Sequence, residues 1–215
     1  METLIGKVPD DWAQTLLGEV CHIVAGPSGG SLRHGIGGVP PGIPMITPKD
    51  LNGNRLVYDG IAMVEPATAA KLSRYQLAAG DIVCARIGDL TRQTLIDVEH
   101  EGWLFGTGCL RLRPLAAINP RYLIHYLGHP AVREWIQRNA TGSAIPSMSA
   151  KTLAALPVVL PPDTVQSDIT AVLGALDTKI ALHDQISKTT AAFRDSLLPL
   201  LVAGAVPLPD AGHPR

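Results

Sequence analysis

The chain has 215 residues, 46% of them hydrophobic, which is ample for a packed core and excludes a disordered protein. This length accommodates one full domain with an appendage, or two small domains. A formal net charge of −1 at pH 7 argues against a protein that binds nucleic acid alone through a large basic face. Any nucleic-acid contact must therefore come from local clusters or be shared with a partner.

The cysteines and the chain ends narrow the class further. Cys21, Cys84 and Cys109 are far apart, odd in number and without C-x-x-C spacing, so they predict buried free thiols and neither a zinc site nor a disulfide framework. Residues 1–12 hold no apolar run of signal-peptide length, and the apolar tract at 197–208 is short and broken by prolines. We expect a soluble cytoplasmic protein without membrane contact, metal or cofactor.

The first 115 residues predict a β-rich core with long loops. Six runs rich in β-forming residues are separated by Gly, Asn and Pro, at 19–25, 56–58, 61–65, 81–87, 93–98 and 108–113. In the last run, Cys109, Arg111 and Arg113 point to one face, which places two guanidinium groups together. They form either a phosphate-facing pair or a solvated strand face, and both alternatives stay open.

Two helices should follow. Asn119 is a good N-cap and Pro120 a good first residue for a helix through Leu127. Gly128 and Pro130 then interrupt the pattern before a second helix at 131–139, which packs its tryptophan and isoleucine and stops near a glycine.

Two loops are candidates for contact. The first, at 26–38, is rich in glycine and weakly basic, and it is either a surface loop that adapts to a groove or a disordered excursion; its polar candidates are Ser28, Ser31, Arg33 and His34. The second, at 140–149, is rich in small hydroxyl residues that bond phosphate oxygens or simply form turns; its candidates are Thr141, Ser143 and Ser147.

No catalytic constellation is present. The pair His125 and His129 lacks the glutamate of H-E-x-x-H, and neither a G-x-S-x-G elbow nor a phosphate-binding G-x-x-x-x-G-K-[ST] loop occurs. The sequence therefore offers no residue set that would perform a reaction.

A proline-rich entry at 156–162 leads into one long helix. Asp163 can cap it and Gln166, three residues on, can complete a capping box. The helix should run to Leu198, roughly 54 Å at 1.5 Å per residue, with Pro199 disturbing its last turn or ending it just before.

An apolar seam runs along one side of this helix. Steps of four and three residues pass through Val165, Ile169, Val172, Leu176, Lys179, His183, Ile186, Thr190, Phe193, Leu197 and Leu200, with three polar residues interrupting the middle. The pattern fits an ordinary amphipathic core helix. Its length and seam favour a helix that pairs with another, in this chain or a second one.

The order of these motifs resembles a known family. Several stretches stand in the order found in target recognition domains of type I restriction-modification specificity subunits, namely Trp12, 17–20, 42–46, 49–51, Leu77 and 80–83. The closing signature of that family is similar to 120–123, 141–146, 156–162, Gln166, Ile169, Leu173, Leu176 and Ile180. The resemblance covers nearly the whole chain.

The resemblance implies an α+β fold with a β-rich, DNA-reading target recognition domain at 1–160, carrying small helices. A coiled-coil-like spacer and dimerisation helix at 161–202 follows, and we expect a flexible tail at 203–215. The resemblance also implies a non-catalytic subunit that binds double-stranded DNA and methyltransferase (M) subunits, joined in some systems by restriction (R) subunits. The methyl donor and the chemistry belong to those partners.

The domain-and-helix unit occurs once here, where such subunits commonly carry it twice. We therefore expect a half-size subunit that forms a homodimer and reads a bipartite target with inverted half-sites. Candidate DNA contacts are the two loops with Lys49, Arg86, Arg92, Arg111 and Arg113. The partner helix uses the seam together with Ile180. The alternative is a protein-interaction scaffold with a dimerising helix and no DNA contact.

Overall fold

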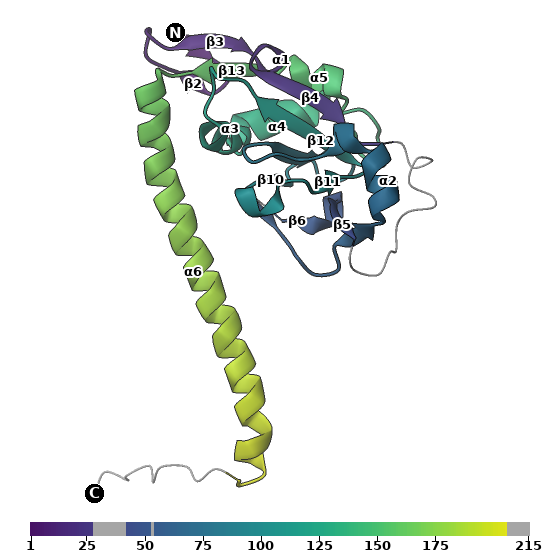
Figure 1. Ribbon diagram of the computed structural model, residues 1–215. Coiled ribbons are helices and arrows are strands. Elements are labelled where there is room, and N and C mark those ends of the chain that lie inside the picture. Colours follow the sequence, from purple (N-terminus) through teal and green to yellow (C-terminus); the bar gives the residue numbers. More distant parts are fainter. Residues whose placement is uncertain (28–41, 53, 206–215) are drawn as a thin grey trace, which may run out of the picture. The chain divides into compact units, whose positions relative to one another are not determined.

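The computed structural model describes residues 1–27, 42–52 and 54–205 (Figure 1). The chain divides into two compact units, Met1–Thr170 and Ala171–Arg215. Ser28, Ser31, Arg33 and His34 lie outside the described residues, as does 206–215 of the expected tail.

A four-stranded antiparallel sheet organises the first unit. Its order is β10 (Gln93–Leu95), β9 (Ile82–Ala85), β12 (Cys109–Pro114) and β4 (Cys21–Ala25). Leu110 lies opposite both Ala25 and Cys84, and Arg111 opposite Val24 and Val83. Because side chains alternate along a strand, the leucines and the arginines of β12 face opposite sides of this sheet.

The larger core lies on the leucine side. It is built with α1 (Leu17–Val20), α3 (Pro120–Leu127), α4 (Pro130–Asn139) and α5 (Ala150–Ala154). Leu17, Leu110, Leu112, Leu123 and Leu156 are fully buried in it.

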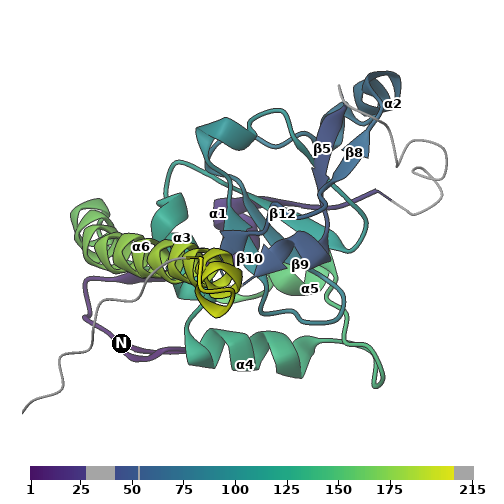
Figure 2. The ribbon, with the colours of Figure 1, turned by 90° about the horizontal axis from the view of Figure 1, so that it is seen from below.

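The arginine side carries two smaller cores. A second sheet, in the order β11 (Leu104–Phe105), β5 (Ile43–Ile46) and β8 (Ala62–Val64), packs here with α2 (Pro66–Lys71) and the hairpin of β6 (Leu51–Asn52) and β7 (Arg55–Leu56). Among the described residues, short 3-10 helices join the strands: η2 (Pro48–Asp50), η3 (Ser73–Tyr75) and η4 (Val98–His100). Figure 2 shows α4 on one side of β9 and β12, with β5, β8 and α2 on the other.

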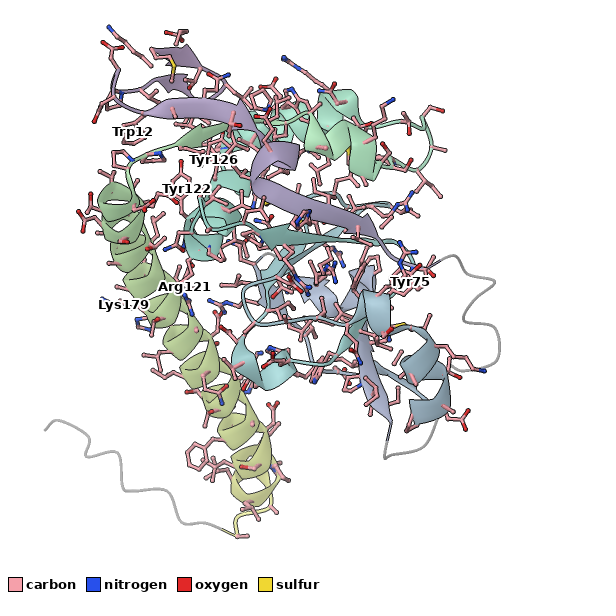
Figure 3. All side chains as sticks on the ribbon, turned by 45° about the horizontal axis from the view of Figure 1, so that its top comes forward. Trp12, Tyr75, Arg121, Tyr122, Tyr126 and Lys179 are labelled. Atoms are coloured by element: carbon pink, nitrogen blue, oxygen red, sulfur yellow. The ribbon has the colours of Figure 1, made fainter. Side chains whose placement is uncertain are left out.

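The proline-rich entry contains a strand that the sequence did not predict. β13 (Pro157–Leu160) pairs antiparallel with β3 (Ala13–Leu16), beside the hairpin of β1 (Glu2–Thr3) and β2 (Gly6–Lys7). The hydroxyls of Tyr122 and Tyr126, labelled in Figure 3, donate to the carbonyls of Val159 and Pro157, each at 2.9 Å. Burial raises the pKa of Tyr126 to about 12.

The predicted α+β class is confirmed, and five of the six β-leaning runs coincide largely with a strand, whereas the run 56–58 shares only Leu56 with β7. The start of the first run is wrong, because residues 19 and 20 close α1. The Asn119 cap is confirmed, since its side chain accepts from the backbone N–H of Arg121 at 2.9 Å. All three cysteines are buried and free, and burial raises the pKa of Cys84 to about 12.

The long helix, α6, runs from Asp163 to Val202 over 40 residues, or about 60 Å. Of the two alternatives for Pro199, a helix that ends just before it is wrong: Pro199 lies inside the helix, and its carbonyl accepts from the backbone N–H of Ala203 at 3.0 Å. None of the helices in the described part of the chain has the length and apolar character of a membrane span.

The predicted capping box is wrong, because the side chain of Gln166 bonds other partners. This side chain is 2% exposed. The Oε1 atom accepts from the backbone N–H of Asn119 at 2.8 Å, and Nε2 donates to the carbonyl of Pro161 at 2.9 Å. Gln166 therefore joins the start of α6 to the start of α3 within the compact unit Met1–Thr170.

Candidate nucleic-acid interface

One edge of the four-stranded sheet gathers three loops, residues 26–27, 86–92 and 106–108, which we call the loop edge. Gly26 N–H donates to the Cys109 carbonyl at 3.0 Å, and Arg86 N–H to the Gly108 carbonyl at 2.8 Å. The Thr107 hydroxyl donates to the Pro27 carbonyl at 2.8 Å. The antiparallel register causes this convergence, because the ends of β4 and β9 meet the start of β12.

The loop edge depends on close backbone packing. A Cβ atom at Gly26 would overlap the carbonyl oxygen of Gly106, so only glycine fits. We expect Gly26→Ala to lower the free energy of unfolding by about 1–3 kcal/mol, as overpacking does. Gly174→Ala is the control, because nothing lies near its Cβ position in a helix, and it should be neutral or slightly stabilising. Equal urea midpoints for both variants would contradict this packing.

The predicted hydroxyl loop docks on the loop edge. Gly88 N–H donates to the Pro146 carbonyl at 2.9 Å, and Met148 N–H to the Arg86 carbonyl at 2.8 Å. Thr141 and Ser147 close the loop through two backbone bonds, and their hydroxyls lie 3.0 Å apart. The two residues thus pair with each other as the ends of a turn do, and Ser143, which lies between them in the chain, is exposed.

Two predicted arginines flank the same edge. Arg86 is half-buried, and its Nε atom has no hydrogen-bond partner within the described residues. Arg92 donates from Nε to Asp89 at 3.1 Å. The Thr91 hydroxyl, which bonds this carboxylate, and the Arg92 cation both hold the pKa of Asp89 below its usual value. Arg92 is therefore positioned by an ionised partner, with its side chain 43% exposed.

Lys49 lies in η2, whose first residue packs against Gly108 of the loop edge: a Cβ atom at Gly108 would lie 3.0 Å from Pro48. The exposed Lys49 ammonium donates to the Gly60 carbonyl at 2.7 Å. Its placement beside the edge is compatible with a phosphate contact.

The loop edge also carries exposed apolar side chains that sequence reasoning missed. Ile145 is 63% exposed and Ile87 is 42% exposed. Ile87 pairs by a β-bridge with Ser147, so both isoleucines belong to the docked pair of loops. An isoleucine within a run of small hydroxyl residues was the only signal available. Such side chains suit contact with thymine methyl groups or with another protein.

Arg111 and Arg113 require a correction. Arg111 is only 7% exposed, so a solvated strand face is wrong for it. Its Nη1 atom donates to the carbonyls of Gln76 at 3.0 Å and Arg74 at 3.3 Å. Arg113 instead forms two hydrogen bonds of 2.7 Å with the buried carboxylate of Asp81. The two guanidinium groups are therefore not an equivalent pair.

The bond to Asp81 should stabilise the domain. Asp81 also accepts from the Ala78 N–H at 2.9 Å. We expect Asp81→Ala to lower the free energy of unfolding by about 2–3 kcal/mol, because charge-assisted bonds are lost and buried donors are left. Asp97→Ala is the control: Asp97 makes an exposed ion pair with Arg121, which is worth little. Equal melting temperatures for the two variants would show that the Asp81 contact is unimportant.

The second unit presents the apolar seam of α6. The large hydrophobic side chains of this unit that are more than half exposed are Val172, Leu176, Ile180, Leu182, Ile186, Phe193, Leu198 and Val202, and Leu200 is 46% exposed. Of these, Val172, Leu176, Ile186, Phe193 and Leu200 are seam positions. Lys179 (Figure 3), His183 and Thr190 are also exposed. Val165 and Ile169 lie in the first unit, and both are half-buried, as Leu197 is in the second. Among the residues described, no group of acidic, histidine or cysteine side chains could hold a metal ion.

The described residues thus form a mixed α+β unit with loops gathered at one edge of its main sheet, followed in the chain by one long helix. The chain belongs to the type I restriction modification DNA specificity domain family, whose family model matches residues 9–189. The predicted family is thereby confirmed. No curated protein matches this sequence.

Solved structures share the fold. A chain from a study of assembly and conformational transition in the type I R-M system has 20% identity and a TM-score of 0.61, covering 89% of this chain and 45% of that one. The HsdS subunit of Thermoanaerobacter tengcongensis has 19% identity and a TM-score of 0.55, covering 82% and 40%. The S subunit from M. genitalium has 14% identity and a TM-score of 0.62, covering 92% and 48%. This chain thus spans less than half the length of these relatives.

Proposed function

We propose that the chain is a non-catalytic DNA specificity subunit that reads one half-site of a bipartite target through the loop edge. The observation that carries this proposal is the convergence of three loops, a docked hydroxyl loop and two arginines at one edge of a rigid sheet, in a family of DNA specificity domains. Loops on a rigid scaffold are where binding residues concentrate.

The reading chemistry is assigned to the arginines. Arg86 and Arg92 offer the planar donor pairs that suit guanine O6 and N7, the commonest specific contact in the major groove. Thr141, Ser143, Ser147 and Lys49 are suited to phosphate oxygens, which set the register of the protein on the duplex.

The seam of α6 is the proposed contact with a second copy of this chain. Its exposed apolar side chains repeat at the spacing of a coiled coil, and burying them needs a partner helix. Two copies related by a two-fold axis would present two loop edges to inverted half-sites, with the helix pair setting the distance between them.

Methyltransferase subunits are the proposed catalytic partners, and restriction subunits are proposed as further members of the same assembly. A net charge of −1 leaves most phosphate neutralisation to these partners. The methyl donor and the reaction then belong to the methyltransferase, while this chain selects the sequence.

The reading role is tested by Arg86→Ala and Arg92→Ala in the complex with methyltransferase subunits. Each should weaken binding to target duplex by about 1–3 kcal/mol and relax the preference at one base pair. The control Arg138→Ala removes an exposed arginine of α4 that pairs with Glu134, and it should change nothing. Fluorescence anisotropy with target and single-base variants measures both effects. Unchanged affinity and preference in the first two variants would refute the assigned role.

A further inference from the structure

A second basic site lies on the arginine side of the sheet, apart from the loop edge. It is an open pocket of about 510 Å³, lined in part by Arg74, Arg111, Arg113, Ser73 and Gln76. Nothing in the reading role proposed above uses Arg74 or this pocket.

The charges in the pocket are not balanced. The carboxylate of Asp81 is bound by Arg113 through two bonds of 2.7 Å. Within residues 1–27, 42–52 and 54–205, no carboxylate forms an ion pair with Arg74 or Arg111. Because arginine keeps its proton in proteins, two positive charges remain.

The guanidinium group of Arg111 has more N–H donors than hydrogen-bond acceptors around it in the described part of the chain. It is more than nine-tenths buried, yet its Nε atom has no hydrogen-bond partner in the described part of the chain. Its Nη1 atom is satisfied by the carbonyls of Gln76 and Arg74. Burial and the neighbouring cation of Arg113 lower the pKa of Arg111, and the carboxylate of Asp81 offsets this shift only in part.

Aromatic stacking fixes the two arginines in place. The Arg74 guanidinium lies 5.1 Å from the ring centroid of Tyr75, labelled in Figure 3, and that of Arg111 lies 5.5 Å from the centroid of Phe105. The two rings meet edge to face at 5.7 Å. The donors are thus pre-organised, which reduces the cost of binding an anion.

We propose that this pocket binds a phosphate group of the DNA backbone, with Arg74 and Arg111 as its donors. The assignment rests on the DNA-reading role proposed above. Guanidinium groups match phosphate oxygens in bidentate geometry. Arg111 lies two residues along β12 from Cys109, which directly follows the loop edge, a distance of about 7 Å at 3.4 Å per residue. This distance is smaller than the major groove, which is about 12 Å wide, so a duplex bound at the loop edge would be wide enough to bring a phosphate to the pocket.

The test uses the complex with methyltransferase subunits and compares Arg74→Ala, Arg111→Lys and the control Arg138→Ala. Anisotropy is measured at several KCl concentrations with target and random duplex. Arg74→Ala should weaken both duplexes equally and reduce the slope of log K against log salt by about 1. Arg111→Lys should also weaken both duplexes equally but leave the slope nearly unchanged, because lysine keeps the charge and loses only the planar donor pair. Arg138→Ala should leave affinity and slope unchanged.

Several outcomes overturn the assignment. A complex that binds DNA with unchanged affinity and slope in both pocket variants refutes the phosphate site alone, whereas a wild-type complex that binds no DNA refutes the reading role as well. Weaker association of Arg74→Ala with methyltransferase in the absence of DNA would mark a protein contact. A rise in melting temperature with inorganic phosphate, at constant ionic strength, that Arg74→Ala removes without any effect on DNA would assign the pocket to free phosphate.

Discussion

Two glutamates on the proposed partner face of α6, Ile180→Glu beside the seam and Ile186→Glu on it, are expected to convert a dimer of this chain into monomers. These isoleucines are 52% and 60% exposed within their own chain, so a partner helix is needed to bury them. Burying one such side chain contributes about 1.5–3 kcal/mol. Four of them in a dimer supply roughly 6–12 kcal/mol, comparable to the binding free energy of about 8 kcal/mol for a micromolar complex.

Sedimentation equilibrium at micromolar concentration measures this change. Its matched control is Ala181→Glu with Ala192→Glu, which adds the same charges at exposed positions on the opposite side of the helix by the 100° step per residue. The control should remain dimeric. A dimer that survives the isoleucine substitutions would place the interface elsewhere, and a monomeric wild type would remove the homodimer from the proposal.

Replacing Gln166 by alanine is expected to lower the free energy of unfolding of the compact unit by about 2–4 kcal/mol. The substitution leaves the Asn119 N–H and the Pro161 carbonyl without their partner in a buried place, and each unsatisfied group costs about 1–3 kcal/mol. For a chain of this size the melting temperature should fall by roughly 4–16 °C. Calorimetry of the purified protein measures it.

Gln185→Ala is the control for this effect. Gln185 lies in the same helix, is exposed, and bonds only Thr189 at 3.4 Å among the described residues, so its loss should leave the melting temperature within about a degree or two of wild type. Similar melting of the two variants would show that Gln166 does not hold the helix entry to α3.

The case of Gln166 also shows where sequence reasoning ends. A glutamine three residues after an aspartate satisfies the spacing of a capping box, and the sequence favours that local bond. The observed partner, Asn119, is 47 residues away. Nothing in local spacing distinguishes a local bond from a long-range one, because the glutamine can make either.

The exposure of Arg111 could not be predicted for a related reason. The alternation of β12 correctly placed both arginines on one face, since that depends only on the pleat of a strand. The second sheet covers that face, with Phe105 lying against Arg111. The position of Phe105 depends on the parallel pairing of β11 with β5. Non-local pairing of this kind leaves no local signature, so a buried arginine was read as part of a surface.

The loop edge was predicted in its parts and not as a whole. The sequence marked Arg86, Arg92 and the hydroxyl loop separately, by residue type and turn composition. Their meeting is a consequence of strand register and of bonds such as Gly88 to Pro146, which join segments far apart in the chain. The strand β13 was not predicted, because prolines stand on both sides of its valines and proline is rare inside strands.

Selection of a DNA sequence for a methyltransferase is the role on which the other proposals depend. It can be measured by co-expressing the chain with type I methyltransferase subunits and mapping methylated bases across the genome by single-molecule sequencing. We expect one bipartite motif with inverted halves, whose base preference is relaxed in Arg86→Ala and retained in Arg138→Ala. Methylation that is absent, or that has the same motif with and without this chain, would contradict this role.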